Sequence, residues 1–418
     1  MIAADDYNIT TIRARFPSLT IKDNNINRIY LDNPGGTQIC KASLDKIQDY
    51  LINSNANRGG SFRTSIDTES ILLEARRAMS KFLNAASDRE IVFGKNMTSL
   101  TFAISRSLAK WIQTEDEIVV TRLDHDGNIS PWLQIAYETG AKIRWIDFNP
   151  KDCTLDLDDL KSKLNERTRL VALGCASNSV GTINPYRDVI GWAHEVGALV
   201  FLDAVHYAPH ALIDVESWDC EFLACSAYKF FGPHVGILWG KRKHLQSLTA
   251  YKLKTVPDSL PDKWMTGTQN HECLAGTLAA VNYLADIGRK CAEDQSLPRR
   301  AALETAFNSI QPYEQFLVER LLAGLRNIPG IQIWGINDPA RAQERLPTLS
   351  ITHHRLSPEA LATELGQRGL FVWHGNYYAL ELSESLGLEP DGMVRIGLVH
   401  YNTADEVDRL LGELEQLA

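Results

Sequence analysis

Lys229 stands where packing alone does not explain a charged side chain. The residues before it, 221–225, read as a buried apolar strand, and two aromatic residues, a glycine and a proline follow it at once. Burying a lysine ammonium is costly. A lysine in this position therefore indicates an amine that has to be neutral and reactive, as it is when it forms a Schiff base.

A second apolar segment, 198–202, ends in Asp203. An unpaired carboxylate at a strand end is costly, whereas pairing with a pyridinium nitrogen stabilises both charges. Pyridoxal phosphate needs a lysine for its aldehyde and an acid for its ring nitrogen, so Asp203 and Lys229 together predict this cofactor. His206 is expected to pack on the ring or contact its substituents. Ser226 and Tyr228, which flank the lysine, are expected to hold the phosphate.

A further candidate for the phosphate is the segment Asn96-Met97-Thr98-Ser99, which follows a predicted strand and opens a helix. A helix N-terminus offers free N–H groups and the positive end of the helix dipole. The hydroxyl of Thr98 adds a donor, so Met97 and Thr98 are candidate cofactor-binding residues. The alternative is that these side chains only cap the helix, because threonine and serine are ordinary caps.

His125 and Asn178 lie on loops that follow two other predicted strands. A histidine there can stack on a pyridine ring and exchange protons with a substrate, and the asparagine amide could donate to the ring oxygen. A solvated histidine and a turn asparagine are the alternatives. Arg395, on a strand near the C-terminus, is a candidate for binding a substrate carboxylate, with a surface salt bridge as its alternative.

The elements that must position these residues alternate between strands and helices from residue 90 onward. This order predicts a mostly parallel sheet covered on both faces, with functional loops at the carboxyl ends of the strands. The predicted strands are 91–93, 117–121, 142–146, 170–173, 199–202, 222–225 and 236–239, and the helices between them include 99–111, 131–139, 157–164 and 186–196.

The two ends of the chain have a different organisation. Helices are predicted at 43–53 and at 67–84, the second capped by Asp67. A long helix, 303–325, is expected to be kinked or split by Pro312. The strands 331–334, 348–351 and 394–398, interleaved with helices 357–368 and 403–416, predict a small α+β unit. The expected domains are an N-terminal arm (1–30) packing with the small domain, a large cofactor-binding domain (31–285) and a small C-terminal domain (286–418).

Composition and charge narrow the class of protein. The chain has 418 residues, of which 44% are hydrophobic and 23% charged, with a formal net charge of −9. That charge disfavours nonspecific binding to nucleic acid or anionic membranes. No apolar run approaches the ~18 residues of a membrane span, and the acidic N-terminus lacks a signal pattern. The seven widely spaced cysteines favour scattered reduced thiols over disulfides or a zinc site. We therefore expect a cytoplasmic protein without a structural metal.

Taken together, these residues resemble the class V aminotransferase family, and within it the branch of cysteine desulfurases and selenocysteine lyases. The resemblance runs over nearly the whole chain. It rests on Tyr30-Leu31-Asp32-Asn33, on 178–185, on Asp203-Ala204-Val205-His206, on Ser226-Ala227-Tyr228-Lys229, on Gly267-Thr268-Gln269-Asn270 and on 395–403. It implies the type I fold of pyridoxal-phosphate-dependent transferases, with a mostly parallel seven-stranded sheet in the large domain and a small α+β domain at the C-terminus.

The resemblance also implies roles for individual residues. Lys229 would be the Schiff-base lysine, Asp203 the partner of the pyridine nitrogen, His125 the stacking residue and Arg395 the substrate-carboxylate arginine. Asn178 would contact the ring oxygen, and Thr98, Ser226 and Tyr228 would hold the phosphate. Thr268 resembles the residue that reaches the phosphate of the neighbouring subunit, which implies a homodimer with shared active sites. The substrate pocket would include Gly36, Arg58, Asn376 and Tyr378.

The chain departs from the family pattern at several of these positions. Pro34-Gly35-Gly36 stands where desulfurases have Ala-Ala or similar residues, His206 where they usually have glutamine, and Tyr228 where they usually have histidine. The largest departure is in 373–380, where Tyr378 takes the place of the nucleophilic cysteine. A desulfurase needs that thiolate to accept the substrate sulfur.

The expected function is therefore that of a pyridoxal phosphate lyase acting on an amino acid, which eliminates a β leaving group from cystine or a cysteine conjugate without a persulfide cysteine. His125 or Tyr378 could assist the leaving group. The alternatives are a class V aminotransferase or an amino-acid epimerase, and, from another class, a noncatalytic scaffold or sulfur-transfer partner that kept the fold.

Overall fold

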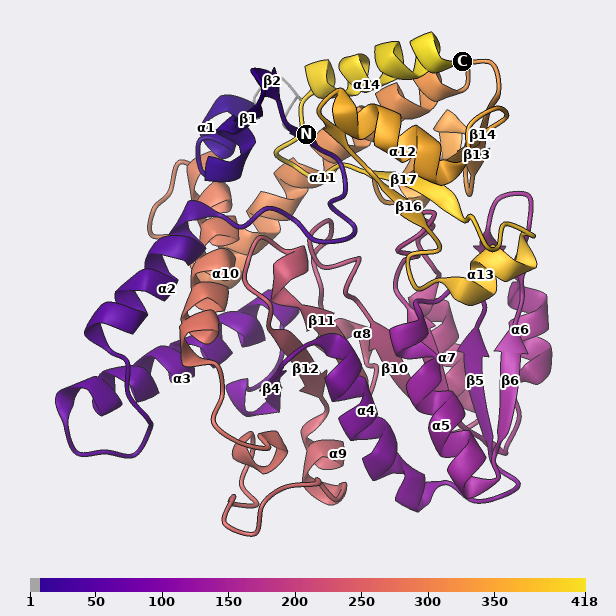
Figure 1. Ribbon diagram of the computed structural model, residues 1–418. Helices are drawn as coiled ribbons and strands as arrows, with labels where there is room; N and C mark the ends of the chain where they lie inside the picture. The colour runs from indigo at the N-terminus through magenta and orange to yellow at the C-terminus, as the bar shows by residue number, and fades with distance from the viewer. Residues whose placement is uncertain (1–7) are drawn as a thin grey trace.

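A seven-stranded sheet is the centre of the molecule and sets where polar side chains gather (Figure 1). The computed structural model describes residues 8–418, so the part of the predicted N-terminal arm that falls on 1–7 lies outside the described residues. The strand order is β4-β12-β11-β10-β9-β5-β6. The strands are β4 (Ile91–Gly94), β5 (Glu117–Thr121), β6 (Lys142–Ile146), β9 (Thr168–Gly174), β10 (Leu199–Asp203), β11 (Phe222–Ser226) and β12 (Gly236–Gly240).

The sheet is mostly parallel, as predicted. β12 runs antiparallel to both β11 and β4, and the other pairings are parallel. Side chains alternate along each strand, so every strand contributes to both faces of the sheet, and both faces are covered. In β10, Phe201 packs in the cluster on one face, whereas Val200 and Leu202 pack in the cluster on the other. The first face is covered by α4 (Met97–Leu108) and α5 (Ser130–Thr139), and the second by α3 (Arg63–Leu83), α7 (Tyr186–Glu195) and α10 (His271–Cys291).

A smaller antiparallel sheet follows in the C-terminal part, in the order β13-β14-β17-β16. In Figure 1 it lies at the end of the molecule toward which β5 and β6 point. Its strands are β13 (Ile331–Trp334), β14 (Thr348–His353), β16 (Trp373–Gly375) and β17 (Met393–Gly397), and its helices are α12 (Pro358–Gln367) and α14 (Ala404–Leu417). The predicted α/β fold with a smaller α+β part is thereby confirmed.

The N-terminal segment adds a strand to the C-terminal part, where β3 (Ile29–Tyr30) pairs in parallel with β15 (Leu370–Phe371). The remaining helices are α1 (Ile9–Arg13), α2 (Lys41–Asn53), α6 (Leu157–Lys163), α8 (Val215–Trp218), α9 (Arg242–Ser247), α11 (Arg299–Leu325) and α13 (Leu380–Ser385), and the remaining strands are β1 (Lys22–Asp23), β2 (Ile26–Asn27), β7 (Phe148–Asn149) and β8 (Thr154–Leu155). Within residues 8–418, no helix is both long enough and apolar enough to cross a bilayer.

One local prediction was wrong, and of the two alternatives for Pro312 the split is wrong while the kink stays a prediction. Asp67 does not cap α3, which begins at Arg63 with Phe62 as its N-cap. Asp67 instead accepts a hydrogen bond from the Arg63 side chain at 2.7 Å, an i,i+4 pair inside the helix. Pro312 does not split α11, which is one helix from Arg299 to Leu325. Pro312 and the residue four positions before it are both exposed, so the carbonyl left without its helical partner faces water.

Candidate active site

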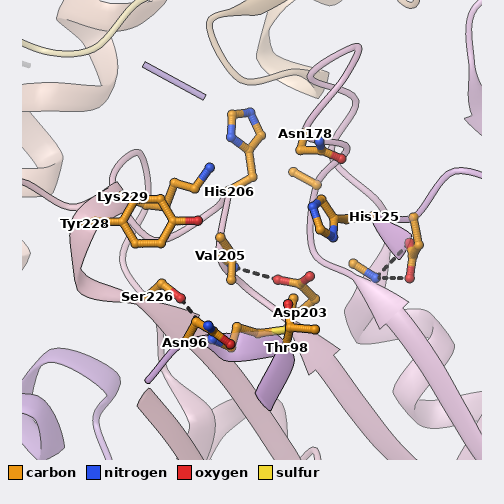
Figure 2. Close-up of a pocket in the computed structure, with 14 residues that line it drawn as sticks. Asn96, Thr98, His125, Asn178, Asp203, Val205, His206, Ser226, Tyr228 and Lys229 are labelled. Carbon is orange, nitrogen blue, oxygen red and sulfur yellow. Dashed lines mark hydrogen bonds between the residues drawn. The ribbon is translucent and has the colours of Figure 1, made fainter. Parts of the chain in front are cut away.

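An inner cavity opens where the carboxyl ends of β9, β10 and β11 meet the N-terminus of α4 (Figure 2). Figure 2 shows Lys229 and Tyr228 on one side of this cavity and His125 and Asn178 on the other, with Asp203 and Thr98 below. The cofactor-site residues predicted from the sequence that line it are Met97, Thr98, His125, Asn178, Asp203, His206, Ser226, Tyr228 and Lys229. Residues far apart in the chain are thus brought together at the strand ends, as expected for a parallel sheet.

Lys229 ends a short turn, 227–229, that continues directly from β11. Its Nζ donates hydrogen bonds to the carbonyl oxygen of Pro34 and, at 3.1 Å, to that of Gly35. Burial and the nearby positive charge of Arg395 lower the pKa of Lys229 to about 7. A large share of this amine is therefore neutral at neutral pH, which is the form that attacks a carbonyl carbon.

Asp203 is the last residue of β10 and is buried. Its Oδ1 accepts a hydrogen bond from the Val205 amide at 2.8 Å. Burial raises the pKa of Asp203 to about 6, against the lowering effect of that hydrogen bond and of the Lys229 charge. A cationic partner in the cavity would favour the ionised carboxylate.

His206 is buried, and its Nε2 has no hydrogen-bond partner among the described residues. Burial, with the charge of His210 as a smaller cause, lowers the pKa of the His206 ring. A neutral ring with an unsatisfied nitrogen lines the cavity, and such a buried polar atom fits a site built for a polar ligand.

The N-terminus of α4 forms the end of the cavity opposite His206. Asn96 is the N-cap and accepts a hydrogen bond from the Ser99 amide at 2.8 Å. Because Asn96 caps the helix, the Thr98 side chain is not required for capping and lines the cavity. The Met97 amide donates to Ser226 Oγ at 3.2 Å, which ties β11 to the helix start. The site thus offers backbone and hydroxyl donors suited to a phosphate.

His125 lies on the loop after β5, where its Nδ1 accepts a hydrogen bond from the Gly127 amide at 2.8 Å. The neutral ring therefore carries its proton on Nε2. Burial and the charge of Lys229 lower the pKa of His125 to about 4, so the ring is neutral at neutral pH. The adjacent Asp124 is buried and accepts from the Gly174 amide at 2.9 Å and from Asn128 at 2.7 Å. These bonds fix the loop that carries His125.

An outer cavity adjoins the inner one and shares Lys229, His125, Asn178 and Tyr228 with it. Its own lining comes from the N-terminal turn and the C-terminal part: Asp32, Pro34, Gly35, Trp373, Tyr377, Tyr378 and Arg395. A ligand held in the inner cavity would therefore project past Lys229 into a second, separately built compartment.

Arg395, on β17, is the buried cation of the outer cavity. It pairs with Asp32 Oδ1 at 2.9 Å and donates to the Asn178 carbonyl at 3.1 Å. Its guanidinium lies 4.3 Å from the centre of the Tyr377 ring, a cation–π contact. Its Nε has no partner among the described residues. The alternative of a surface salt bridge is wrong, because Arg395 is buried and faces the cavity.

Asn178 is buried between the two cavities. Its Nδ2 donates to the Tyr377 carbonyl at 2.9 Å, and its Oδ1 has no partner among the described residues. One N–H of the predicted donor to a ring oxygen is therefore engaged and the other remains, and the side chain holds the loop of Tyr377 against the large sheet.

Four predicted residues lie elsewhere. Arg58 and Thr268 line a separate groove, in which Arg58 pairs with Asp262 at 2.9 Å. Gly36 lies behind Tyr228: a Cβ on Gly36 would lie 3.2 Å from the Tyr228 ring. Asn376 supports the Tyr378 loop, since its Oδ1 accepts from the Tyr378 amide at 3.1 Å. Within one chain, none of these four residues lines either cavity.

The residues present fit pyridoxal phosphate. The inner cavity combines a partly neutral lysine, a buried acid, a helix N-terminus with hydroxyl donors, an unpartnered ring nitrogen on His206 and the second N–H of the Asn178 amide. These are the groups that the aldehyde, ring nitrogen, phosphate and ring oxygen of the cofactor require. In the part of the chain that the structure describes, no group of three or more His, Cys, Asp or Glu could hold a metal ion.

Several residues of the site carry no clear signal in the sequence. Asp124 directly precedes His125, and Asp32 lies in the quoted Tyr-Leu-Asp-Asn segment, but neither was given a role. Tyr377 and Trp373 lie in the loop that was singled out for Tyr378. Their neighbours in the sequence were the only available signal, because the contacts that define their roles are made across the fold.

Comparisons with known proteins agree on one family. The profile of the family described as aminotransferase class-V matches residues 29–410. The aminotransferase-like protein FGM3 of Gibberella zeae is 33% identical over 428 residues, covering 100% of both chains. A probable cysteine desulfurase of Synechocystis sp. is 30% identical, covering 97% of this chain and 94% of its own.

Two solved structures share the whole fold. The cysteine desulfurase CsdA from Escherichia coli superposes with a TM-score of 0.83 at 25% identity, covering 98% of each chain. The apo cysteine desulfurase from Thermococcus onnurineus NA1 superposes with a TM-score of 0.84 at 25% identity, covering 96% of this chain and 98% of its own.

Proposed function

Since this chain belongs to the class V aminotransferase family and is a pyridoxal-phosphate-dependent enzyme, we propose that it is a carbon–sulfur lyase. It eliminates a sulfur-linked group from Cβ of an amino acid, such as cystine or a cysteine conjugate, without a persulfide cysteine. One observation carries the proposal. A complete set of cofactor-type residues adjoins an outer cavity in which Tyr378 lies where the family resemblance implies a cysteine.

A sulfur-accepting thiol is missing from the described site. None of the seven cysteines lines the inner or the outer cavity as residues 8–418 define them. Cys175 and Cys225 are buried below the site, and burial raises the pKa of both thiols. A buried, protonated thiol is a poor nucleophile. This supports a reaction that needs no protein thiolate.

Bound pyridoxal phosphate supplies an electron sink for the negative charge that develops at Cα. In the proposal, Asp203 holds the proton of the ring nitrogen, and the α4 N-terminus with Ser226 binds the phosphate. Arg395 binds the substrate carboxylate. The Lys229 amine would hold the cofactor by its aldehyde, and Nζ would serve as the base at Cα of the substrate.

Nζ of Lys229 removes the proton from Cα, the Cβ–S bond breaks, and its electron pair leaves with the sulfur. The sulfur takes up a proton, so a thiol is released from a conjugate and a persulfide from cystine. In the proposal His125 supplies this proton, which is supported by its Nε2–H and its position in the outer cavity. Water then converts the remaining three-carbon fragment to pyruvate and ammonia.

The proposal includes a homodimer, in which Arg58 and Thr268 of one subunit reach the site of the other. It is supported by their position in a groove apart from the site of their own chain. We also propose the domain division at residues 30 and 285, and a cytoplasmic location, which the seven unpaired cysteines favour.

The experiment is to incubate the holoenzyme with cystine and with several cysteine conjugates, and to measure pyruvate, ammonia and released thiol. Stoichiometric formation of pyruvate, ammonia and the sulfur product, a thiol from a conjugate and a persulfide from cystine, is expected, and Lys229→Ala should abolish it. Amino-group transfer to a keto acid without thiol release would instead identify an aminotransferase. Loss of optical purity at Cα without thiol release would identify an epimerase. Either result, or no reaction with any sulfur substrate, would overturn the lyase proposal.

A further inference from the structure

The rim of the outer cavity is aromatic, whereas its floor is charged. Trp373 and Tyr378 line it and are 58% and 72% exposed, so residues 8–418 leave large parts of both rings uncovered. The floor holds the Lys229 amine and the Arg395 guanidinium. An amino acid would therefore place its charged end deep in the site and its side chain against the aromatic rim.

The small sheet places Trp373 next to Arg395. Trp373 on β16 is the direct cross-strand partner of Arg395 on β17. Side chains of directly opposed residues in an antiparallel pair lie on the same face of the sheet. Trp373 thus stands beside the arginine assigned to the substrate carboxylate, at one wall of the outer cavity.

Tyr378 stands beside His125, with ring centres 5.5 Å apart and an interplanar angle of 39°. Its backbone is strained, because Tyr377 and Tyr378 both have positive φ, at 58° and 60°. Such a conformation costs a bulky residue about 1–3 kcal/mol and persists only where surrounding contacts enforce it.

Three hydrogen bonds enforce this conformation of the loop. Asn178 Nδ2 donates to the Tyr377 carbonyl at 2.9 Å, and the Asp126 amide donates to the Tyr378 carbonyl at 2.6 Å. The Tyr378 amide donates to Asn376 Oδ1 at 3.1 Å. The contacts fix the loop backbone on both sides of the site and leave the Tyr378 side chain free to meet a ligand.

The charges of the outer cavity suit one charged end of a ligand. Arg395 is available for the α-carboxylate, and Asp32 is paired with that same arginine. No further arginine or lysine besides Lys229 lines the outer cavity within the described residues. The second carboxylate of cystine would find no second cation there, whereas a planar apolar group would find two aromatic faces.

We propose that Trp373 and Tyr378 form an aromatic clamp that selects amino acids carrying a planar, apolar group on sulfur, such as S-benzyl or S-aryl cysteine, over cystine and S-alkyl cysteines. The substrate class rests on the proposed lyase function, but the binding preference does not. Two experiments therefore separate the clamp from the reaction.

The first experiment compares kcat/KM for S-benzylcysteine with that for S-methylcysteine. Each aromatic contact is expected to contribute about 2- to 12-fold to this ratio. Trp373→Ala and Tyr378→Ala should each lower the ratio by that factor, and Tyr378→Phe, which keeps the ring, should retain it. Tyr137→Ala, at a tyrosine that is 87% exposed on α5, is the matched control. An unchanged ratio in both alanine variants would overturn the clamp.

The second experiment measures binding without cleavage. Homophenylalanine and norleucine have no sulfur leaving group, and each is titrated into the holoenzyme while the absorbance of the bound cofactor is followed. Tighter binding of homophenylalanine in the wild type, lost in Tyr378→Ala, is expected. If this preference holds but no sulfur substrate releases a thiol, the clamp stands and the lyase function fails. Equal binding of the two ligands would refute the clamp even if thiol release is observed.

Discussion

At the scale of single residues, the reactivity of Lys229 depends on a balance of neighbouring charges. Burial and Arg395 both lower the pKa of its amine, whereas Asp32 and Asp203 raise it, and the result is a pKa of about 7. The arginine that we assign to the substrate carboxylate therefore also prepares the lysine. Arg395 would thus both bind the substrate carboxylate and lower the pKa of the neighbouring lysine.

This balance predicts how the apoenzyme captures its cofactor as pH changes. Below its pKa the amine is protonated and has no lone pair, so the capture rate should rise about tenfold per pH unit up to about 7 and then level off. An ordinary lysine, with a pKa of 10.5, would keep accelerating through pH 9. Stopped-flow absorbance after mixing with pyridoxal phosphate measures the rate, with a free lysine derivative as the reference for titration of the cofactor itself.

Asp32→Asn is the matched variant for this experiment. It removes a negative charge that raises the pKa of Lys229, so the midpoint of the pH profile should move to lower pH. A wild-type midpoint near that of the free lysine derivative, or a midpoint that rises in Asp32→Asn, would contradict this account of the lysine.

At the scale of elements, the phosphate end of the site depends on how closely α4 approaches β12. A Cβ on Gly236 would lie 2.3 Å from the carbonyl carbon of Asn96, the N-cap of α4. No side chain fits there unless the helix start moves. The N-terminus of α4 is thus positioned by the absence of a side chain on the neighbouring strand.

Gly236→Ala should therefore displace the start of α4 and weaken cofactor binding. We expect the dissociation constant for pyridoxal phosphate to rise by about tenfold or more, since hydrogen bonds to charged groups contribute about 1.5–3 kcal/mol each. Gly191→Ala in α7, where an added Cβ meets nothing within 4 Å, is the control and should leave binding unchanged. Equal affinities in the two variants would contradict the role of Gly236.

Arg345 holds the loop of Asn178 to the C-terminal part. It is buried, and its guanidinium donates to the carbonyl oxygens of Val180, at 3.0 Å, and of Thr348 and Ile336. Burial lowers the pKa of Arg345 to about 9. Its charge is solvated by peptide dipoles of three separate segments, the loop after β9, the segment after β13, and β14, and Arg345 therefore joins the loop after β9 to the C-terminal part.

Arg345→Met should lower the free energy of unfolding by about 2–4 kcal/mol, because it leaves several buried carbonyls without a donor. Denaturation in urea, followed by fluorescence and circular dichroism together, measures this loss. Arg63→Ala, at an exposed arginine, should change stability by no more than about 0.5 kcal/mol. A loss in Arg345→Met as small as that of the control would show that stability does not depend on the contacts of Arg345.

Much of the sheet was predictable because its strands are short apolar runs with clear ends. The predicted bounds of β5 and β6 agree with the structure, and Asp203 and Lys229 were found because a charge at the end of such a run is conspicuous. The partner of Arg395 was not predictable. Asp32 lies 363 positions away along the chain, and the pair exists only once the N-terminal turn meets β17. The same holds for Asn178, whose donor is engaged by a carbonyl that tertiary packing brings near.

At the scale of the whole molecule, two residues with an expected role at the site lie apart from the site of their own chain. Arg58 and Thr268 lie together in a groove away from both cavities, although the family resemblance gives them roles at a site. In the proposed homodimer, each groove faces the cofactor of the other subunit. The quaternary structure would then be a condition of activity.

Mixing two inactive variants tests this arrangement. Lys229→Ala removes the reactive amine, and Thr268→Ala removes the hydroxyl proposed to act on the other subunit. After denaturation and refolding together, mixed dimers contain one site with an intact lysine and an intact threonine, so activity should return to a fraction of the wild-type level. Sedimentation equilibrium checks the dimer. A dimer without recovered activity would place Thr268 in the site of its own chain, and a monomer would overturn the proposal.

The pairing of Asp32 with Arg395 has a consequence for which compounds can inhibit the enzyme. The protein holds its own carboxylate against the arginine at 2.9 Å, so an incoming acid competes with an internal ligand that is always present. Simple amines and amino alcohols have no carboxylate, so they cannot replace Asp32 at Arg395, however well they fit the aromatic rim. An inhibitor that lacks a carboxylate would leave the internal pair closed, and potency should therefore follow the strength of the acid–guanidinium contact before it follows size or shape.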